Sequence, residues 1–138
     1  MNTVELVLDK SRYLYYSIGM TDTKGNRNQE EIKRRIKEIQ QELSALGPMR
    51  PGSLSEQYNV CGTAGCRCKD PEKPLKHGPY YHLNYTWRGK SRTEFVRAED
   101  VEEVRERLGR YKRFRAFTRE WVDLSVELAR LERAARSG

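Results

Sequence analysis

All three cysteines and both histidines of the chain fall within one short segment, CGTAGCRCKDPEKPLKHGPYYH, residues 61–82. Four residues separate Cys61 from Cys66, and a single residue separates Cys66 from Cys68. Thiolate sulfurs bind zinc at about 2.3 Å in a tetrahedron, and the small residues Gly62 and Gly65 let the backbone turn tightly between ligands. An odd number of clustered cysteines favours a metal site over disulfides. We therefore predict a metal site in this segment.

A histidine is the expected fourth ligand. His77 precedes Gly78-Pro79, where the backbone is constrained, whereas His82 falls on the polar face of a predicted strand. We favour His77 and keep His82 as the alternative. Three thiolates and one imidazole would close a tetrahedron around Zn²⁺ and leave no position for a reactive water, which indicates a structural site and no enzyme. Redox sensing by the thiolates is a minor alternative, and an iron–sulfur cluster usually needs four cysteines.

The charge of the chain is positive and unevenly distributed. Its 138 residues carry 27 basic and 20 acidic side chains, for a net charge of +7, and only 36% of the residues are hydrophobic. Residues 47–97 hold nine basic and four acidic residues, and residues 105–119 hold seven basic residues against Glu106 alone. This pattern favours a polyanion such as nucleic acid as the partner, with a merely solvated surface as the alternative. The small apolar fraction means that a metal or a partner chain would help the core.

The remaining sequence patterns argue against a membrane protein and against several enzyme classes. The chain opens MNTVELVLDK and shows neither a secretory leader nor a long apolar segment, so we expect a cytoplasmic protein. In that reducing compartment, clustered cysteines are better explained as metal ligands than as disulfides. The sequence has no phosphate-binding glycine loop, no nucleophile elbow and no informative pair of carboxylates.

The apolar pattern predicts an α+β fold: a small antiparallel β-sheet with a Cys3His zinc knuckle, flanked by an N-terminal helix and a long C-terminal helix. Asn28 and Glu31 form a capping box at the start of the first helix. A phase break near Gly109 predicts two C-terminal helices, 98–108 and 110–135, bent or separated there. The longer helix is expected to align Phe114, Phe117, Trp121, Leu124, Leu128 and Leu131 in one seam. We expect one compact domain with an N-terminal extension (1–27, a β-hairpin in one interpretation), an amphipathic helix (28–47), a zinc-binding β module (48–97) and a C-terminal helical region (98–138).

Three strands are expected in the β module, at residues 52–60, 79–87 and 91–97. A three-residue turn, RGK, would join the last two and place Phe95 beside Leu83 on the apolar face. A ribbon of this kind fits the major groove of duplex DNA, with RNA left open, so we expect the polar face to contact base edges and the turn to contact phosphates. The polar face would hold His82, Asn84, Thr86, Arg92 and Glu94. The residues expected to contact nucleic acid are Asn84, Thr86, Arg88, Lys90, Arg92, Arg97, Lys112, Arg113 and Arg115.

A series of short motifs follows in order along the chain: GSL (52–54), Tyr58, CGTAGCRC (61–68), HGPYY (77–81), Gly89-Lys90, Val96 and YKRFR (111–115). Over roughly residues 30–131 the chain resembles a bacterial and archaeal family of small basic, zinc-ribbon-like proteins catalogued as a domain of unknown function. The resemblance implies that His77, the histidine of HGPYY, is the fourth ligand. It also implies a link to mobile genetic elements, and hence to DNA, but no activity.

The competing class of function is a protein-interaction adaptor. In that interpretation the helices 29–46 and 110–135 pair, within one chain or as a homodimer, and the zinc site only supports them. A zinc enzyme is the third class, and it would require an open coordination position.

Overall fold

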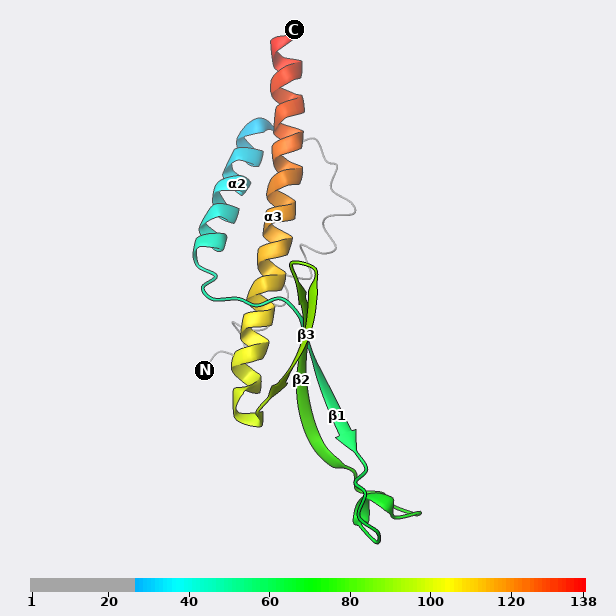
Figure 1. The fold of residues 1–138 in the computed structure, drawn as a ribbon. Coiled ribbons are helices and arrows are strands. Elements are labelled where there is room, and N and C mark those ends of the chain that lie inside the picture. Colours follow the sequence, from blue (N-terminus) through cyan, green and yellow to red (C-terminus); the bar gives the residue numbers. More distant parts are fainter. Residues whose placement is uncertain (1–26) are drawn as a thin grey trace. The chain divides into compact units, whose positions relative to one another are not determined.

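The computed structural model describes residues 27–138, so the N-terminal hairpin predicted within residues 1–27 lies outside the described part. Within residues 27–138 the elements confirm the α+β class, with a helix before and a long helix after a small antiparallel sheet (Figure 1). Between residues 27 and 138, no helix is long and apolar enough to cross a membrane. In chain order the elements are α2 (Gln29–Ser44), β1 (Ser53–Asn59), η1 (Arg67–Lys69), β2 (His77–Trp87), β3 (Lys90–Val96), η2 (Ala98–Asp100) and α3 (Val101–Arg136).

The described residues form two compact units that share helix α3. One unit contains α2 and the part of α3 within Arg113–Gly138. The other unit, Leu46–Lys112, contains the sheet, the cysteine segment and the first part of α3. Each unit has its own hydrophobic core, to which α3 contributes different residues.

Helix α2 begins and packs as its sequence predicts. Asn28 Oδ1 accepts a hydrogen bond from the backbone N–H of Glu31 at 2.9 Å, and the Glu31 carboxylate accepts one from the backbone N–H of Asn28. This capping box satisfies two donors that the first helical turn would otherwise leave unpaired. Ile32 and Ile39 are fully buried in a core with Leu124 of α3. Helix α2 runs antiparallel to this part of α3 (Figure 1), so the two helices pair within one chain, which is one of the two arrangements expected.

The sheet is an antiparallel meander in the order β1-β2-β3. One face, here called the covered face, packs Leu83 of β2 and Val96 of β3 against Val101 and Leu108 of α3. Leu83 is completely buried, so this face contains the centre of the core of its unit. The opposite face, here called the open face, carries Ser53, Ser55, Tyr80, His82, Asn84, Thr86, Ser91, Thr93 and Phe95.

The turn between β2 and β3 is shorter than predicted. Trp87 pairs with Lys90, so the loop consists of Arg88 and Gly89, with φ of 50° and 75°. Positive φ at both positions is typical of a two-residue type I′ turn, whose twist matches that of the flanking strands. Asparagine followed by glycine is the usual sequence of such a turn, and arginine is an uncommon substitute in the first position.

The shorter turn reverses the predicted faces of β3. A shift of pairing by one residue moves every side chain of a strand to the other face of the sheet. Phe95 lies opposite His82 on the open face, and the prediction that it sits beside Leu83 is wrong. Arg92 and Glu94 lie on the covered face, opposite Tyr85 and Leu83, and not with the polar residues of β2 as predicted.

Helix α3 is continuous, so the predicted alternative of two helices separated near Gly109 is wrong. The change of phase in the apolar pattern marks a change of packing partner: Val101 and Leu108 belong to the core of the sheet unit, and Leu124 to the core with α2. A glycine inside a helix costs only about 1 kcal/mol relative to alanine, which packing on both sides of Gly109 offsets.

The predicted seam of the second half of α3 is confirmed except at its first residue. Phe114 is exposed, because at 100° per residue it lies about 60° from Phe117 and at the edge of the stripe. The residues of this seam that contribute to the core with α2 are Phe117, Trp121, Leu124, Leu128 and Leu131.

Candidate metal centre and nucleic-acid interface

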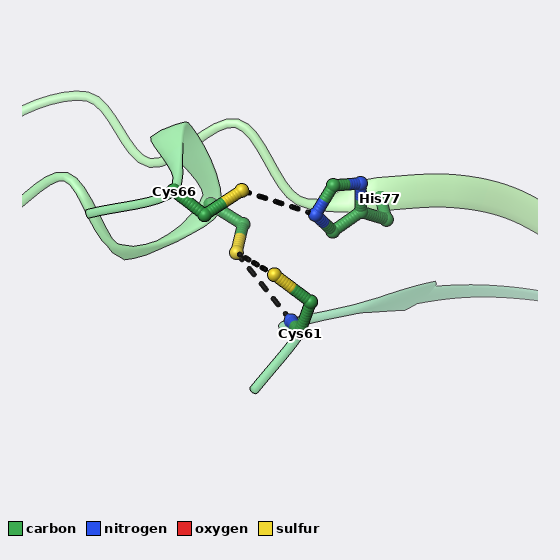
Figure 2. Close-up of side chains that lie close together, drawn as sticks. Cys61, Cys66 and His77 are labelled. Atoms are coloured by element: carbon green, nitrogen blue, oxygen red, sulfur yellow. Dashed lines mark hydrogen bonds between the residues drawn. The ribbon is translucent and has the colours of Figure 1, made fainter. Parts of the chain in front are cut away.

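The segment between β1 and β2 gathers four side chains that can bind a metal. Cys61 follows the end of β1, Cys66 precedes the short helix η1, Cys68 lies within η1, and His77 is the first residue of β2. Their ligand atoms all lie within 4.8 Å of one another. Figure 2 shows the Cys66 sulfur directed at the His77 ring. The Cys61 sulfur contacts that of Cys68. These four residues can therefore converge on one ion.

The distances within this group fit a zinc tetrahedron. The sulfurs of Cys61 and Cys68 are 3.5 Å apart, and the Cys66 sulfur is 3.3 Å from Nε2 of His77. Two sulfurs bound to the same zinc at about 2.3 Å would be about 3.8 Å apart in a tetrahedron. The side chains thus need only small shifts to bind Zn²⁺. Three sulfurs and one imidazole nitrogen are also a donor set that zinc prefers.

Local hydrogen bonds hold the ligand-bearing loop in shape. The backbone N–H of Lys69 donates to the carbonyl of Cys66 at 2.9 Å, which closes the single turn of η1. The backbone N–H of Leu75 donates to the carbonyl of Arg67 at 3.0 Å and closes the longer loop that leads to β2. Asp70 Oδ1 accepts from the backbone N–H of Glu72 at 2.8 Å, an Asx-type turn. The loop therefore has a defined path even though its residues are mostly exposed.

The thiols of the site differ in acidity. The pKa of Cys61 is lowered to about 6, and the largest cause is a hydrogen bond from the backbone of Thr63. A hydrogen bond from the backbone of Cys68 lowers the pKa of Cys66. Burial raises the pKa of the Cys68 thiol, whereas the nearby sulfurs of Cys61 and Cys66 raise the pKa of His77. The site thus stabilises negative charge on two sulfurs, which suits a cationic ligand.

The two histidines occupy different environments. His77 lies with the three thiols, whereas His82 lies within the sheet, where its ring meets Phe95 edge-on at a centroid distance of 6.0 Å. The alternation of β2 places His82 on the open face with Asn84, as its sequence position predicts. Of the two sequence candidates for the fourth ligand, the geometry selects His77.

The residues predicted to contact nucleic acid lie on different elements and on different faces of the sheet. Asn84 and Thr86 lie on the open face, where Asn84 Oδ1 accepts from the Thr93 hydroxyl at 2.7 Å and Thr86 bonds to the Ser91 hydroxyl at 2.7 Å. Arg88 and Lys90 are exposed at the hairpin turn, and Arg97 directly follows β3. The covered-face residue Arg92 is separated from Asn84 and Thr86 by the sheet. Lys112, Arg113 and Arg115 lie on α3.

Sequence reasoning missed one residue that the structure places prominently. Phe95 is 64% exposed on the open face, although its apolar character indicated a core position. The signal that could have found it is the Arg88-Gly89 pair, because a two-residue turn at that pair fixes the register of β3.

Comparison with protein families gives a match that covers α2, the sheet, the loop with the candidate metal ligands and the start of α3. A family model described as "Domain of unknown function (DUF6788)" matches residues 29–106. The chain belongs to this family. No curated protein and no solved structure shows detectable similarity to this chain.

Membership of the DUF6788 family supports the resemblance to a domain of unknown function. The matched range includes all four side chains of the candidate metal site. The basic segment at residues 111–115 lies beyond that range. The family description carries no activity, so a function must be inferred from the geometry and charge of the site.

Proposed function

We propose that this protein is a non-catalytic zinc protein that binds nucleic acid inside the cell. The observation that carries the proposal is the convergence of Cys61, Cys66, Cys68 and His77 within 4.8 Å at one end of the sheet. A metal bound there would link the end of β1, helix η1 and the start of β2. Cross-linking three backbone segments in this way stabilises a small sheet whose apolar core is limited.

Zinc is the metal that the donor set favours, and its role is structural. Three thiolates and one imidazole complete a four-coordinate site, whereas catalytic zinc sites keep one position for water. The protein's own contribution is to hold two thiols at lowered pKa and to position the histidine at the first residue of β2. These features support metal retention and give no group a role in bond making or breaking.

The nucleic-acid part of the proposal is supported by charge. Residues 47–97 carry nine basic and four acidic side chains, and Arg88 and Lys90 project from the hairpin turn. Cations at the end of a hairpin suit phosphate contacts. The expectation of duplex DNA depended on a face shared by Asn84, Thr86 and Arg92, and the register of β3 removes Arg92 from that face. Without Arg92, the face with Asn84 and Thr86 has fewer side chains that could contact the base edges of a duplex.

A charge-reversal experiment tests nucleic-acid binding. Binding of fluorescent single-stranded and duplex oligonucleotides to the zinc-loaded protein is measured over a series of salt concentrations. The double variant Arg88→Glu/Lys90→Glu should bind at least about tenfold more weakly, and the slope of log K against log salt should fall by about two. The matched control, Arg34→Glu/Lys37→Glu, changes charge equally on exposed positions of α2 and should retain most binding. Absence of binding to every oligonucleotide at low salt would contradict the proposal.

A specific observation keeps the adaptor alternative in view. Val122 and Val126 of α3 are exposed although they lie in the half of the helix that packs on α2. Two exposed valines four residues apart lie on one face of a helix and can contact a second helix. Sedimentation of the wild type and of Val122→Lys/Val126→Lys decides this point: a dimer that becomes monomeric supports an assembly function, and a monomeric wild type contradicts it.

A further inference from the structure

The open face of the sheet carries three aromatic rings in adjacent positions. Phe95 lies opposite His82, and Tyr80 lies on the same face two residues before His82. Phe95 is 64% exposed and Tyr80 37% exposed, so both rings present surface to solvent. Single exposed apolar residues are common on protein surfaces, but neighbouring rings on one flat face form a surface suited to a flat ligand.

The central ring of this group has an unusual feature. His82 Nδ1 is buried and has no hydrogen-bond partner. Among the side chains of residues 27–138, it is the one buried nitrogen or oxygen of which this is true. The ring instead meets Phe95 edge-on, with an angle of 70° between the ring planes. Buried polar atoms without partners are rare, because they lose their hydrogen bonds to water. The His82 ring is thus held by packing against Phe95 and not by a hydrogen bond at Nδ1.

The distribution of charge on the sheet indicates what kind of ligand this face accepts. The carboxylates of the described strands, Glu56 and Glu94, are paired with residues of the covered face, as is Arg92. The open face is therefore neutral at its centre, and its hydroxyl and amide groups bond to one another beside the rings. Cations occur at its margins, with Arg88 in the turn and Arg97 after β3, whereas Lys90 pairs with Trp87 on the covered-face side. A ligand with flat, uncharged groups and a negatively charged edge matches this arrangement.

We propose that the open face is a stacking platform for unpaired bases of single-stranded nucleic acid, with Phe95 as the principal ring and Tyr80 and His82 beside it. This inference depends on the proposed nucleic-acid binding and specifies its partner. Bases of a single strand expose their flat faces to aromatic side chains, whereas those of a duplex are stacked on one another. The phosphates of the same strand follow the basic margins of the face.

The test uses the full-length, zinc-loaded protein and fluorescence anisotropy. The probes are labelled oligothymidine of roughly 12 nucleotides, oligouridine of the same length and a duplex of the same length, a size within the range of single-strand sites. Phe95→Ala should weaken binding of the single strands by about 5- to 100-fold, the range that loss of one base–aromatic stack gives. Phe95→Trp should retain binding, because it keeps a stacking ring.

Two further variants separate stacking from folding and from general apolar contact. Phe95→Leu keeps an apolar side chain of similar size but no ring, and it should lose binding as Phe95→Ala does. Trp87→Ala removes another exposed aromatic ring of the same hairpin, 52% exposed and paired with Lys90 on the covered-face side. It should change binding by less than about twofold. Zinc content and circular dichroism of each variant report whether the fold is retained.

The outcomes distinguish this inference from the proposed function. If Phe95→Ala and Phe95→Leu bind single strands as the wild type does, or if the wild type prefers the duplex, the stacking platform is wrong. The proposed nucleic-acid binding would still stand in that case if Arg88→Glu/Lys90→Glu lowers the affinity. If the wild type binds none of the three probes at low salt, the proposed function fails and the platform fails with it.

Discussion

At the scale of single residues, backbone geometry positions the four side chains that we propose as metal ligands. Gly78 follows the ligand His77 and has a φ of 138°, in the region that residues with a Cβ rarely adopt. A Cβ at this position would lie 2.7 Å from the carbonyl oxygen of Gln57 and 3.1 Å from the ring of Tyr58. Glycine therefore allows β1 to approach β2 closely where His77 must turn toward the thiols.

Substitution of Gly78 by alanine should damage both the sheet and the metal site. Combined backbone strain and overpacking should lower the free energy of unfolding by roughly 2–4 kcal/mol. Urea unfolding and zinc competition with a chelator measure the two effects. Gly62→Ala is the matched control, because nothing lies within 4 Å of its added Cβ. Equal stability and equal zinc affinity of the two variants would contradict this role of Gly78.

Arg88, in the turn, is expected to strengthen nucleic-acid binding but to lower the free energy of unfolding. Its φ of 50° lies in the left-handed region, which costs a non-glycine residue of order 1 kcal/mol and which asparagine tolerates better. Arg88→Asn should therefore stabilise the protein by about 0.5–1 kcal/mol while weakening nucleic-acid binding. Thermal unfolding provides the measurement. Arg92→Asn, at an ordinary strand position, should give no such gain, and an equal gain there would refute the explanation.

The convergence of Cys61, Cys66, Cys68 and His77 is the part of the molecule that the sequence predicts best. Few side chains bind zinc, so three cysteines beside a histidine restrict the interpretation before any fold is known. The choice of His77 over His82 also followed from local information, because strand alternation assigns His82 to a face. Phe95 could not be placed in this way, since its face depends on whether the preceding turn has two or three residues.

At the scale of elements, the sheet is tied to the segment before it by a three-residue cluster. Glu94 of β3 accepts hydrogen bonds from the Tyr85 hydroxyl at 2.7 Å and from the Arg50 guanidinium at 2.9 Å. The guanidinium of Arg50 also lies 5.3 Å from the centre of the Tyr85 ring. The Tyr85 hydroxyl and then Arg50 lower the pKa of Glu94 below its ordinary value of 4.5. Charged Glu94 therefore stabilises the folded state.

The stabilisation from Glu94 should depend on pH in a defined direction. Because the pKa of Glu94 is lower in the folded than in the unfolded protein, its contribution is complete above pH 4.5 and is lost as the pH falls through the folded-state pKa. The difference in melting temperature between wild type and Glu94→Gln should thus shrink as the pH falls below 4.5. Glu102→Gln, at an exposed position of α3, serves as control. If the difference in melting temperature between wild type and Glu94→Gln stays constant as the pH falls below 4.5, the charge of Glu94 does not stabilise the fold in this way.

A helix boundary can be predicted from sequence where a local capping motif determines it. It cannot be predicted in this way where tertiary packing determines whether the helix continues. The capping box of Asn28 and Glu31 specifies the start of α2 from four residues of sequence. The continuity of α3 through Gly109 could not be predicted in the same way. A break in apolar phase has the same sequence signature whether a helix ends or continues into a second core.

At the scale of the whole molecule, metal-dependent stability should be confined to one of the two units. All four ligands belong to the unit Leu46–Lys112, whereas α2 packs in the core of the other unit. Removal of zinc by a chelator should raise hydrogen exchange at least about tenfold in β1 and in the first half of β2. The amides of α2 should change little, and added zinc should restore protection. Equal loss of protection in α2 and β1 would show that metal supports both units.

The central claim is that Cys61, Cys66, Cys68 and His77 hold a structural zinc ion with a complete set of protein ligands. X-ray absorption at the zinc edge of the purified protein tests this claim most directly, because it reports the atoms bound to the metal. The account predicts three sulfurs at about 2.3 Å, one nitrogen at about 2.0–2.1 Å and no bound water. A purified protein without zinc, fewer than three sulfur ligands, or an oxygen in the coordination sphere would contradict it.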